Sequence, residues 1–224
     1  INISCKYDCI TCKDLIQSGP PAVYQLIPKK DNIGTIRRIT LGKKNPTKTN
    51  RTVLLVGETG TGKSTMIDAL INYDMGVKWE DNVWFEIIEK DRKRRKSEDK
   101  TLPYSLTIID TPGYGDIRGT EHDDIISHRL FDLFRSDDRV HEMNVMGLVL
   151  KASENCPSDR QRYIFDSVAS PIGKDMKNIV ILITHSDGRI PRNVIQAVEV
   201  ANIKCAKDEK YHPVHFLFQN CQNI

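Results

Sequence analysis

The sequence predicts an α/β fold in which a doubly wound, mostly parallel sheet carries helices on both faces. From about residue 50 onward, aliphatic runs of strand length alternate with amphipathic stretches of helical length, which is the pattern of strand–helix–strand units. Runs such as "NIVILIT" are apolar throughout, as expected of strands that are buried on both faces. With 224 residues, 39% of them hydrophobic, the chain is long enough to bury such a core.

Six strands are expected where aliphatic runs are bounded by polar or turn-forming residues. They are Thr52–Val56, Val83–Ile88, Tyr104–Ile109, Asn144–Leu150, Asn178–Thr184 and Pro213–Phe218. The helical stretches between most of them are Lys63–Tyr73, Glu121–Arg135, Ser158–Ser167 and Pro191–Ala206. The stretch "TIRRITLG", Thr35–Gly42, is also compatible with a short strand.

Two regions are expected along the chain. Residues 1–50 are interpreted as an N-terminal segment and linker, the end of a preceding region, because their pattern is weak and the polar "KKNPTKTNR" near residue 50 is typical of a linker. Residues 51–224 form the α/β domain. The chain starts without methionine and stops straight after an apolar run. We therefore expect both ends to be cuts in a longer polypeptide, and the domain to be truncated at its C-terminus.

The stretch "VLLVGETGTGKST", Val53–Thr65, contains the pattern G-x-x-x-x-G-K-[ST] from Gly57 to Ser64, between an expected strand and an expected helix. Its glycines let successive amides point inward, the helix adds the positive end of its dipole, and the Lys63 ammonium reaches the outer phosphates. An accidental glycine-rich turn is the alternative, but motif, strand and helix agree. This predicts a three-layer P-loop NTPase. The expected nucleotide-binding residues here are Gly57, Glu58, Thr59, Gly60, Thr61, Gly62, Lys63, Ser64 and Thr65.

A second motif, "LTIIDTPGYGD", places Asp110 at the end of an aliphatic strand. A carboxylate at this position can hold Mg²⁺ through water, and Ser64 is expected as the other metal ligand. The Gly113 amide can donate to the γ-phosphate. An isolated D-T-P-G would be only a turn, but this one follows a phosphate-binding motif at a suitable distance.

A third motif, T-H-S-D at Thr184–Asp187, follows the strand "NIVILIT". An aspartate there can accept hydrogen bonds from guanine N1–H and the 2-amino group, and adenine offers neither donor. We therefore expect Asp187 to select guanine and His185 to stack on the purine. An ordinary helix-capping aspartate is the alternative, and an ATPase remains open if the motif is accidental.

Together the three motifs resemble those of the septin, immunity-associated nucleotide-binding (AIG/GIMAP) and chloroplast import-receptor group of P-loop GTPases, over roughly residues 51–224. The resemblance implies GTP or GDP as ligand, Mg²⁺ as cofactor, and a homodimer or homo-oligomer that assembles through G domains. The closing "FQN", Phe218–Asn220, is similar to an F-N-N with which immunity-associated members touch the base. Asn220 is therefore carried over as a base contact.

The sequence departs from this group in two places that concern hydrolysis. No threonine lies between Thr65 and Thr101, where switch I usually supplies one, and Tyr114 stands where many small GTPases have a water-positioning glutamine. No catalytic residue is assigned; Arg118 and His122 are candidates, with surface loop residues as the alternative. We expect a slow, Mg²⁺-dependent GTPase that acts as a switch or assembly module. The alternative is a nucleotide-binding module without hydrolysis.

The composition also indicates which binding partners and which cellular location to expect for the protein. A net charge of +3 from 33 basic and 30 acidic residues predicts no nucleic-acid partner. The run "KDRKRRK", Lys90–Lys96, is either a solvated loop or a surface for phosphates or membranes. Reduced thiols are favoured over a zinc site at Cys5, Cys9 and Cys12, which lack a fourth ligand. With no signal peptide and no transmembrane segment in this stretch, we expect a cytoplasmic location.

Overall fold

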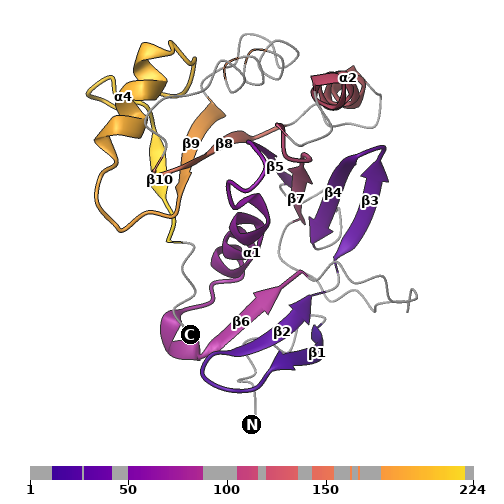
Figure 1. The fold of residues 1–224 in the computed structure, drawn as a ribbon. Helices are drawn as coiled ribbons and strands as arrows, with labels where there is room; N and C mark the ends of the chain where they lie inside the picture. The colour runs from indigo at the N-terminus through magenta and orange to yellow at the C-terminus, as the bar shows by residue number, and fades with distance from the viewer. Residues whose placement is uncertain are drawn as a thin grey trace. The chain divides into compact units, whose positions relative to one another are not determined.

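The structure of the chain is a computed structural model that describes residues 12–26, 28–41, 50–87, 105–115, 120–135, 143–153, 162, 166 and 178–219. The strands are β1 (Cys12–Gln17), β2 (Ala22–Leu26), β3 (Lys29–Ile33), β4 (Ile36–Leu41), β5 (Asn50–Val56), β6 (Val83–Glu86), β7 (Ser105–Asp110), β8 (Val145–Lys151), β9 (Ile179–Thr184) and β10 (His215–Leu217). The helices are α1 (Lys63–Asp74), α2 (Thr120–Arg135), α4 (Arg192–Val200) and the short 3₁₀-helix η2 (Trp79–Asp81) (Figure 1).

Seven strands form one sheet in the order β10-β9-β8-β5-β7-β4-β3. The strands β5, β8, β9 and β10 run parallel, with Leu54 opposite Met146 and Leu148 opposite Ile181. Along the chain, β5 is followed in this sheet by β7 on one side and then by β8 on the other. The strand order therefore reverses at β5, and in open α/β sheets ligands bind at the carboxyl ends of the strands at such a point.

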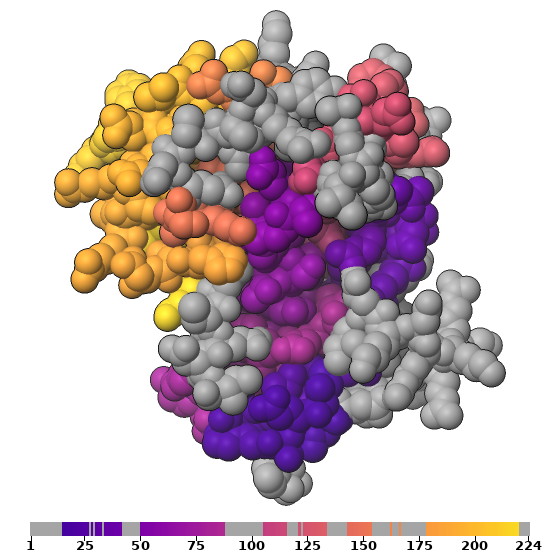
Figure 2. Space-filling model, viewed as in Figure 1, coloured from indigo at the N-terminus to yellow at the C-terminus, as the bar shows by residue number. Residues whose placement is uncertain are grey.

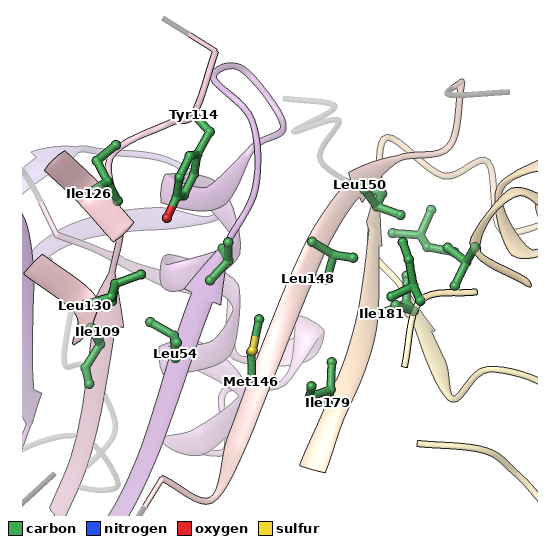
Figure 3. Close-up of a cluster of buried hydrophobic side chains, with 14 of the residues drawn as sticks. Leu54, Ile109, Tyr114, Ile126, Leu130, Met146, Leu148, Leu150, Ile179 and Ile181 are labelled. Atoms are coloured by element: carbon green, nitrogen blue, oxygen red, sulfur yellow. The ribbon is translucent and has the colours of Figure 1, made fainter. Parts of the chain in front are cut away.

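Both faces of this sheet are covered, because every residue of β7 is buried. On one face, α2 and α4 contribute Ile126, Leu130 and Val194 to a cluster that also contains strand residues such as Leu54. Figure 3 shows this cluster, with Tyr114 beside Ile126. The predicted α/β fold of the P-loop NTPase type is confirmed.

Three boundaries differ from the sequence prediction for local reasons. The strand expected to reach Ile88 ends at Glu86, since the Ile87 amide donates to the side chain of Asp68 instead of a neighbouring strand. The helix expected to reach Ala206 ends at Val200, and Asn202 then adopts a left-handed φ of 52°. The last strand covers only His215–Leu217. The helix expected at Ser158–Ser167 lies outside the described residues apart from Arg162 and Asp166.

The larger difference concerns which strands pair. Strand β6 lies in a separate three-stranded sheet, order β1-β2-β6, where it runs parallel to β2. The place beside β7 is taken by β4, from the N-terminal region. The contacts of Arg37 with Asp110 and of Thr40 with Thr107 indicate an antiparallel register for β4 and β7, because the residue numbers rise on one strand as they fall on the other.

By its internal contacts the chain divides into two compact units. Unit 1 comprises Ile1–Lys30, Ile39–Arg51 and Ile67–Thr107, and unit 2 comprises Asp31–Arg38, Thr52–Met66 and Ile108–Ile224. Unit 1 has a small core of its own, in which Phe85 is fully buried and its backbone is bonded on both sides by the Asn72 side chain. None of the helices in the described ranges has the length and hydropathy that a bilayer crossing requires.

Candidate nucleotide site

The phosphate loop, residues 57–62, connects β5 to α1, which begins at Lys63 as predicted. Gly60 and Gly62 have φ values of 79° and 86°, a left-handed conformation that residues with a Cβ adopt only with strain. The buried Lys63 side chain turns back over the loop, and its Nζ donates to the carbonyl oxygens of Gly57 and Glu58, both at 2.8 Å. The ammonium is thus held at the mouth of the loop.

Burial also changes the ionisation of Lys63. The pKa of this ammonium is lowered from 10.5 to about 8, mainly by desolvation; the charge of Asp110 opposes the change, that of Arg37 adds to it, and that of Glu58 opposes it. The site therefore contains a lysine whose charge is costly to maintain unless an anion is nearby. A phosphate group is such an anion.

The segment after β7 lies directly against the phosphate loop. The Thr59 amide donates to the Tyr114 carbonyl at 2.9 Å, and the Tyr114 amide donates to the Gly57 carbonyl at 3.4 Å. A Cβ on Gly113 would come within 2.3 Å of the Thr59 hydroxyl, so only glycine fits there. The two motifs predicted to contact the phosphates are therefore in contact with each other.

Asp110 provides a buried carboxylate at the end of β7. Its side chain is 1% exposed; Oδ2 accepts a hydrogen bond from Arg37, and Oδ1 has no partner among the described residues. Desolvation raises the pKa of this carboxyl, whereas Arg37 and Lys63 lower it. Ser64 is exposed in the first turn of α1. The oxygen donors of Ser64 and Asp110 suit Mg²⁺.

The base loop, residues 184–188, follows β9 and is joined to the phosphate loop by one side chain. The buried Thr184 hydroxyl lies 2.7 Å from the Thr61 carbonyl oxygen and 3.1 Å from the Leu150 carbonyl oxygen, and it can donate a hydrogen bond to either. His185 and Asp187 are exposed. The predicted phosphate and base motifs therefore lie on two connected loops at one end of the parallel strands.

Asp187 forms a turn and not a helix cap. Its Oδ1 accepts a hydrogen bond from the Arg189 amide at 2.9 Å, and its side chain is 70% exposed. Helix α4 begins at Arg192 with no side-chain cap. In this structure the alternative of a helix-capping aspartate is therefore wrong, and the carboxylate stays accessible to a ligand.

A septin family model matches residues 48–140, which include the phosphate loop and the D-T-P-G motif. The chain carries a septin-like G domain. Two relatives agree: Septin-1 of Drosophila melanogaster is 35% identical over 72 residues, and Septin-2B of Xenopus laevis is 36% identical over 69 residues. Each match covers 29% of this chain and only 19% or 20% of the relative. This chain therefore spans about a fifth of the length of these curated relatives.

Two solved structures that align with this chain have lower sequence identity to it than the two septins. Toc33 from Arabidopsis thaliana aligns with a TM-score of 0.49 and 15% identity, over 78% of this chain and 72% of that protein. Cdc11 from Saccharomyces cerevisiae aligns with a TM-score of 0.41 and 17% identity, over 72% of this chain and 68% of that protein.

Several predicted residues of the septin-like G domain are not described. Arg118, Asn220 and the basic run Lys90–Lys96 lie outside the described residues, as do Cys5 and Cys9. His122 lies in α2, but its side chain is not among those described. Phe218, next to the predicted base contact, is anchored by backbone hydrogen bonds to Ile183 at 2.8 Å and to Ser186 at 3.1 Å.

Three features of the site were missed by sequence reasoning. The Arg37–Asp110 pair joins residues 73 positions apart, and nothing in "TIRRITLG" indicates its partner. The Thr184 hydroxyl was assigned no role, although Thr184 is the first residue of the T-H-S-D motif. Tyr114 is 0% exposed and lies in the hydrophobic cluster. Tyr114 lies between Gly113 and Gly115, a turn-forming context that gave no sign of burial.

Proposed function

We propose that this septin-like G domain binds guanine nucleotides together with Mg²⁺. One observation carries the proposal: the Thr184 hydroxyl connects the phosphate loop, with its buried Lys63, to a base loop with an exposed aspartate. Such a site can contact both ends of one nucleotide. Figure 2 shows atoms of the purple segment, residues 50–75, at the molecular surface, where a soluble ligand can reach them.

The phosphate end depends on backbone amides and Lys63. Backbone amides of residues 60 and 62–64, in the loop and at the start of α1, would provide donors for phosphate oxygens. The amides of Thr59 and Thr61 instead donate to the carbonyls of Tyr114 and Glu58. The Lys63 ammonium, which is bonded to two carbonyls, would move to the outer phosphates. Ser64 and Asp110 would hold the Mg²⁺, whose chemistry there is to neutralise phosphate charge.

The base end depends on Asp187. Its exposed carboxylate can accept hydrogen bonds from guanine N1–H and the 2-amino group. Adenine has neither donor, so bound ATP would cover the carboxylate and leave it without these hydrogen bonds. His185 is held beside Thr184, with 3.1 Å between Nδ1 and Oγ1, in a left-handed conformation with φ of 55°. The imidazole thus belongs to the same short loop as Asp187, and we expect it to stack on the purine.

Slow hydrolysis that controls assembly through G domains is the function we favour. The competing candidate is a module that binds without hydrolysis, and the burial of Tyr114 favours it, because a side chain that is 0% exposed cannot orient a water molecule at the γ-phosphate. Catalysis would then need Arg118 or His122, in the same chain or from a second copy.

Competition binding tests the first proposal. A fluorescent GDP analogue is displaced by unlabelled GTP, ATP or XTP, and we expect GTP to compete at least 100-fold better than ATP, a discrimination of about 3 kcal/mol. Equal displacement by GTP and ATP would refute guanine recognition.

Phosphate release at several protein concentrations tests hydrolysis and assembly. Activity per molecule should rise with concentration, and a larger species should form with a non-hydrolysable GTP analogue but not with GDP. A rate no faster than buffer, with a monomer in both nucleotide states, would leave the passive binding module as the better account.

A further inference from the structure

The strongest unassigned feature of the site is the ion pair between Arg37 and Asp110. Arg37 lies on β4, and its guanidinium bonds Oδ2 of the carboxylate that ends β7. The Asp110 side chain is 1% exposed, whereas that of Arg37 is 36% exposed. The arginine therefore reaches from a partly open position to a fully buried charge.

No other cation in the described part of the chain has a hydrogen bond to this carboxylate. Lys63 is close enough to interact with Asp110 electrostatically, but its Nζ is bonded to the carbonyls of Gly57 and Glu58. A buried carboxylate without a counter-ion is strongly unfavourable. Arg37 thus provides the charge compensation that Asp110 needs for folding.

The same carboxylate is the expected position of a divalent cation. We propose that Arg37 is the resident counter-ion of Asp110, that it competes with Mg²⁺ for this carboxylate, and that it makes nucleotide binding only weakly dependent on a divalent cation. This inference rests on the proposed nucleotide site. Arg37 and Lys63 would together supply the positive charge that the phosphates need.

Arg37 and Mg²⁺ compete because both are positively charged and because both bind oxygens of the Asp110 carboxylate. A guanidinium that bonds Oδ2 uses part of the carboxylate's capacity to accept ligands and leaves Oδ1 as the oxygen without a hydrogen bond, and its charge repels a divalent ion at the same carboxylate. By linkage, each cation lowers the affinity of the other by the same factor. Removing the charge of Arg37 should therefore strengthen metal binding and make nucleotide binding depend on it.

Arg37→Gln is the informative variant, because glutamine keeps an N–H donor for Asp110 and removes the charge. Arg38→Gln is the matched control: Arg38 is the next residue of the same strand, but it pairs with Asp31 of β3. Circular dichroism is used to check that both variants fold.

The first measurement uses fluorescent GDP with excess Mg²⁺ and with EDTA. In the wild type, we expect chelation to weaken binding by less than about 10-fold; in Arg37→Gln the loss should be larger by a factor in the range of about 5 to 150, typical of coupling between sites. Arg38→Gln should behave as wild type. A wild type that loses far more than 10-fold on chelation, or an equal loss in all three proteins, would overturn the proposal.

The second measurement uses Mn²⁺ alone, without nucleotide, followed by the loss of the free-ion electron paramagnetic resonance signal. Arg37→Gln should bind Mn²⁺ about 5-fold or more tightly than the wild type and Arg38→Gln. Equal binding in the three proteins contradicts the inference. A chain that binds no guanine nucleotide but shows this Mn²⁺ difference would refute the proposed function and leave the Arg37–Asp110 competition standing.

Discussion

The phosphate loop and the base loop differ in how far their functional groups are buried. Lys63 is 8% exposed and Asp110 is 1% exposed, and both are bonded within the protein. The Asp187 side chain is 70% exposed, and its carboxylate contacts the backbone amide and the side chain of Arg189. The phosphate end is thus organised by the fold itself, whereas the base end offers an accessible group on a short turn.

From this difference we expect the phosphate end to contribute most of the binding affinity and the base end to contribute most of the selectivity. Groups that are already desolvated and oriented lose little freedom when a ligand arrives, so they can contribute strongly to affinity. Exposed groups contribute once a ligand covers them, and their effect is to distinguish one ligand from another. Substitutions at the two loops should therefore change different observables.

Lys63→Ala should have the largest effect. Loss of a charge-assisted contact to the phosphates should weaken GDP and GTP binding at least 100-fold, about 3 kcal/mol, while the fold remains intact because the core is untouched. Isothermal titration calorimetry checks the affinity and thermal unfolding checks the fold. Lys210→Ala, which removes an exposed lysine in another loop, should leave both unchanged. Wild-type affinity in Lys63→Ala would remove the phosphate-loop assignment.

Asp187→Asn should change selectivity. The amide presents a donor to the donors of guanine, so GTP affinity should fall by about 2 to 4 kcal/mol and preference should move toward XTP. Asp208→Asn is the matched control, because Asp208 also bonds the amide two residues later, in a loop that precedes β10. If both variants keep the wild-type order of GTP, XTP and ATP in competition binding, Asp187 does not read the base.

Thr184→Val tests whether the two loops act as one site. Valine keeps the shape and removes the hydroxyl that contacts the Thr61 carbonyl, which should cost about 1 to 2 kcal/mol of nucleotide affinity. Thr107→Val is the control, since this buried β7 threonine has only a 3.5 Å contact with Thr40. Calorimetry should show weaker GDP binding in the first variant alone; a Thr184→Val affinity no lower than that of Thr107→Val would mean that the contact between the two loops does not support binding.

Asp68→Asn should change the stability of the fold and not nucleotide selectivity, and its effect should depend on pH. Desolvation raises the pKa of Asp68, on α1, from 3.8 to about 7. The unfolded carboxyl loses its proton near pH 4 but the folded one only near pH 7, so Asp68 reduces stability progressively as pH rises between these values. Asparagine avoids this cost and still accepts from the Ile87 amide.

We therefore expect Asp68→Asn to raise the free energy of unfolding by about 1 to 2 kcal/mol at pH 7 to 8, with little gain near pH 4. Urea unfolding at the two pH values measures this. The exposed helical aspartate Asp132 provides the control as Asp132→Asn. A gain that is the same at both pH values would show that titration of Asp68 is not its cause.

The sequence by itself determined the local elements of this protein. The strand at β5, the start of α1 at Lys63 and the aspartate that ends β7 all follow from patterns within a few residues. Glycine spacing, aliphatic runs and a helix start depend on neighbours in the chain, so the chain encodes them directly. The placement of Lys63 beside its own loop is a consequence of this local geometry.

Contacts between residues that are distant in the sequence became evident only from the tertiary structure. The sequence predicted β6 as a strand but not its pairing with β2, and it offered no sign that β4 would bring Arg37 to Asp110. Tyr114 likewise stands in the sequence where many small GTPases have a water-positioning glutamine, and in the structure it is buried beside Ile126 (Figure 3). Strand pairing and side-chain burial are chosen by competition among contacts across the whole chain, and an apolar strand with suitable alternation is compatible with more than one neighbour.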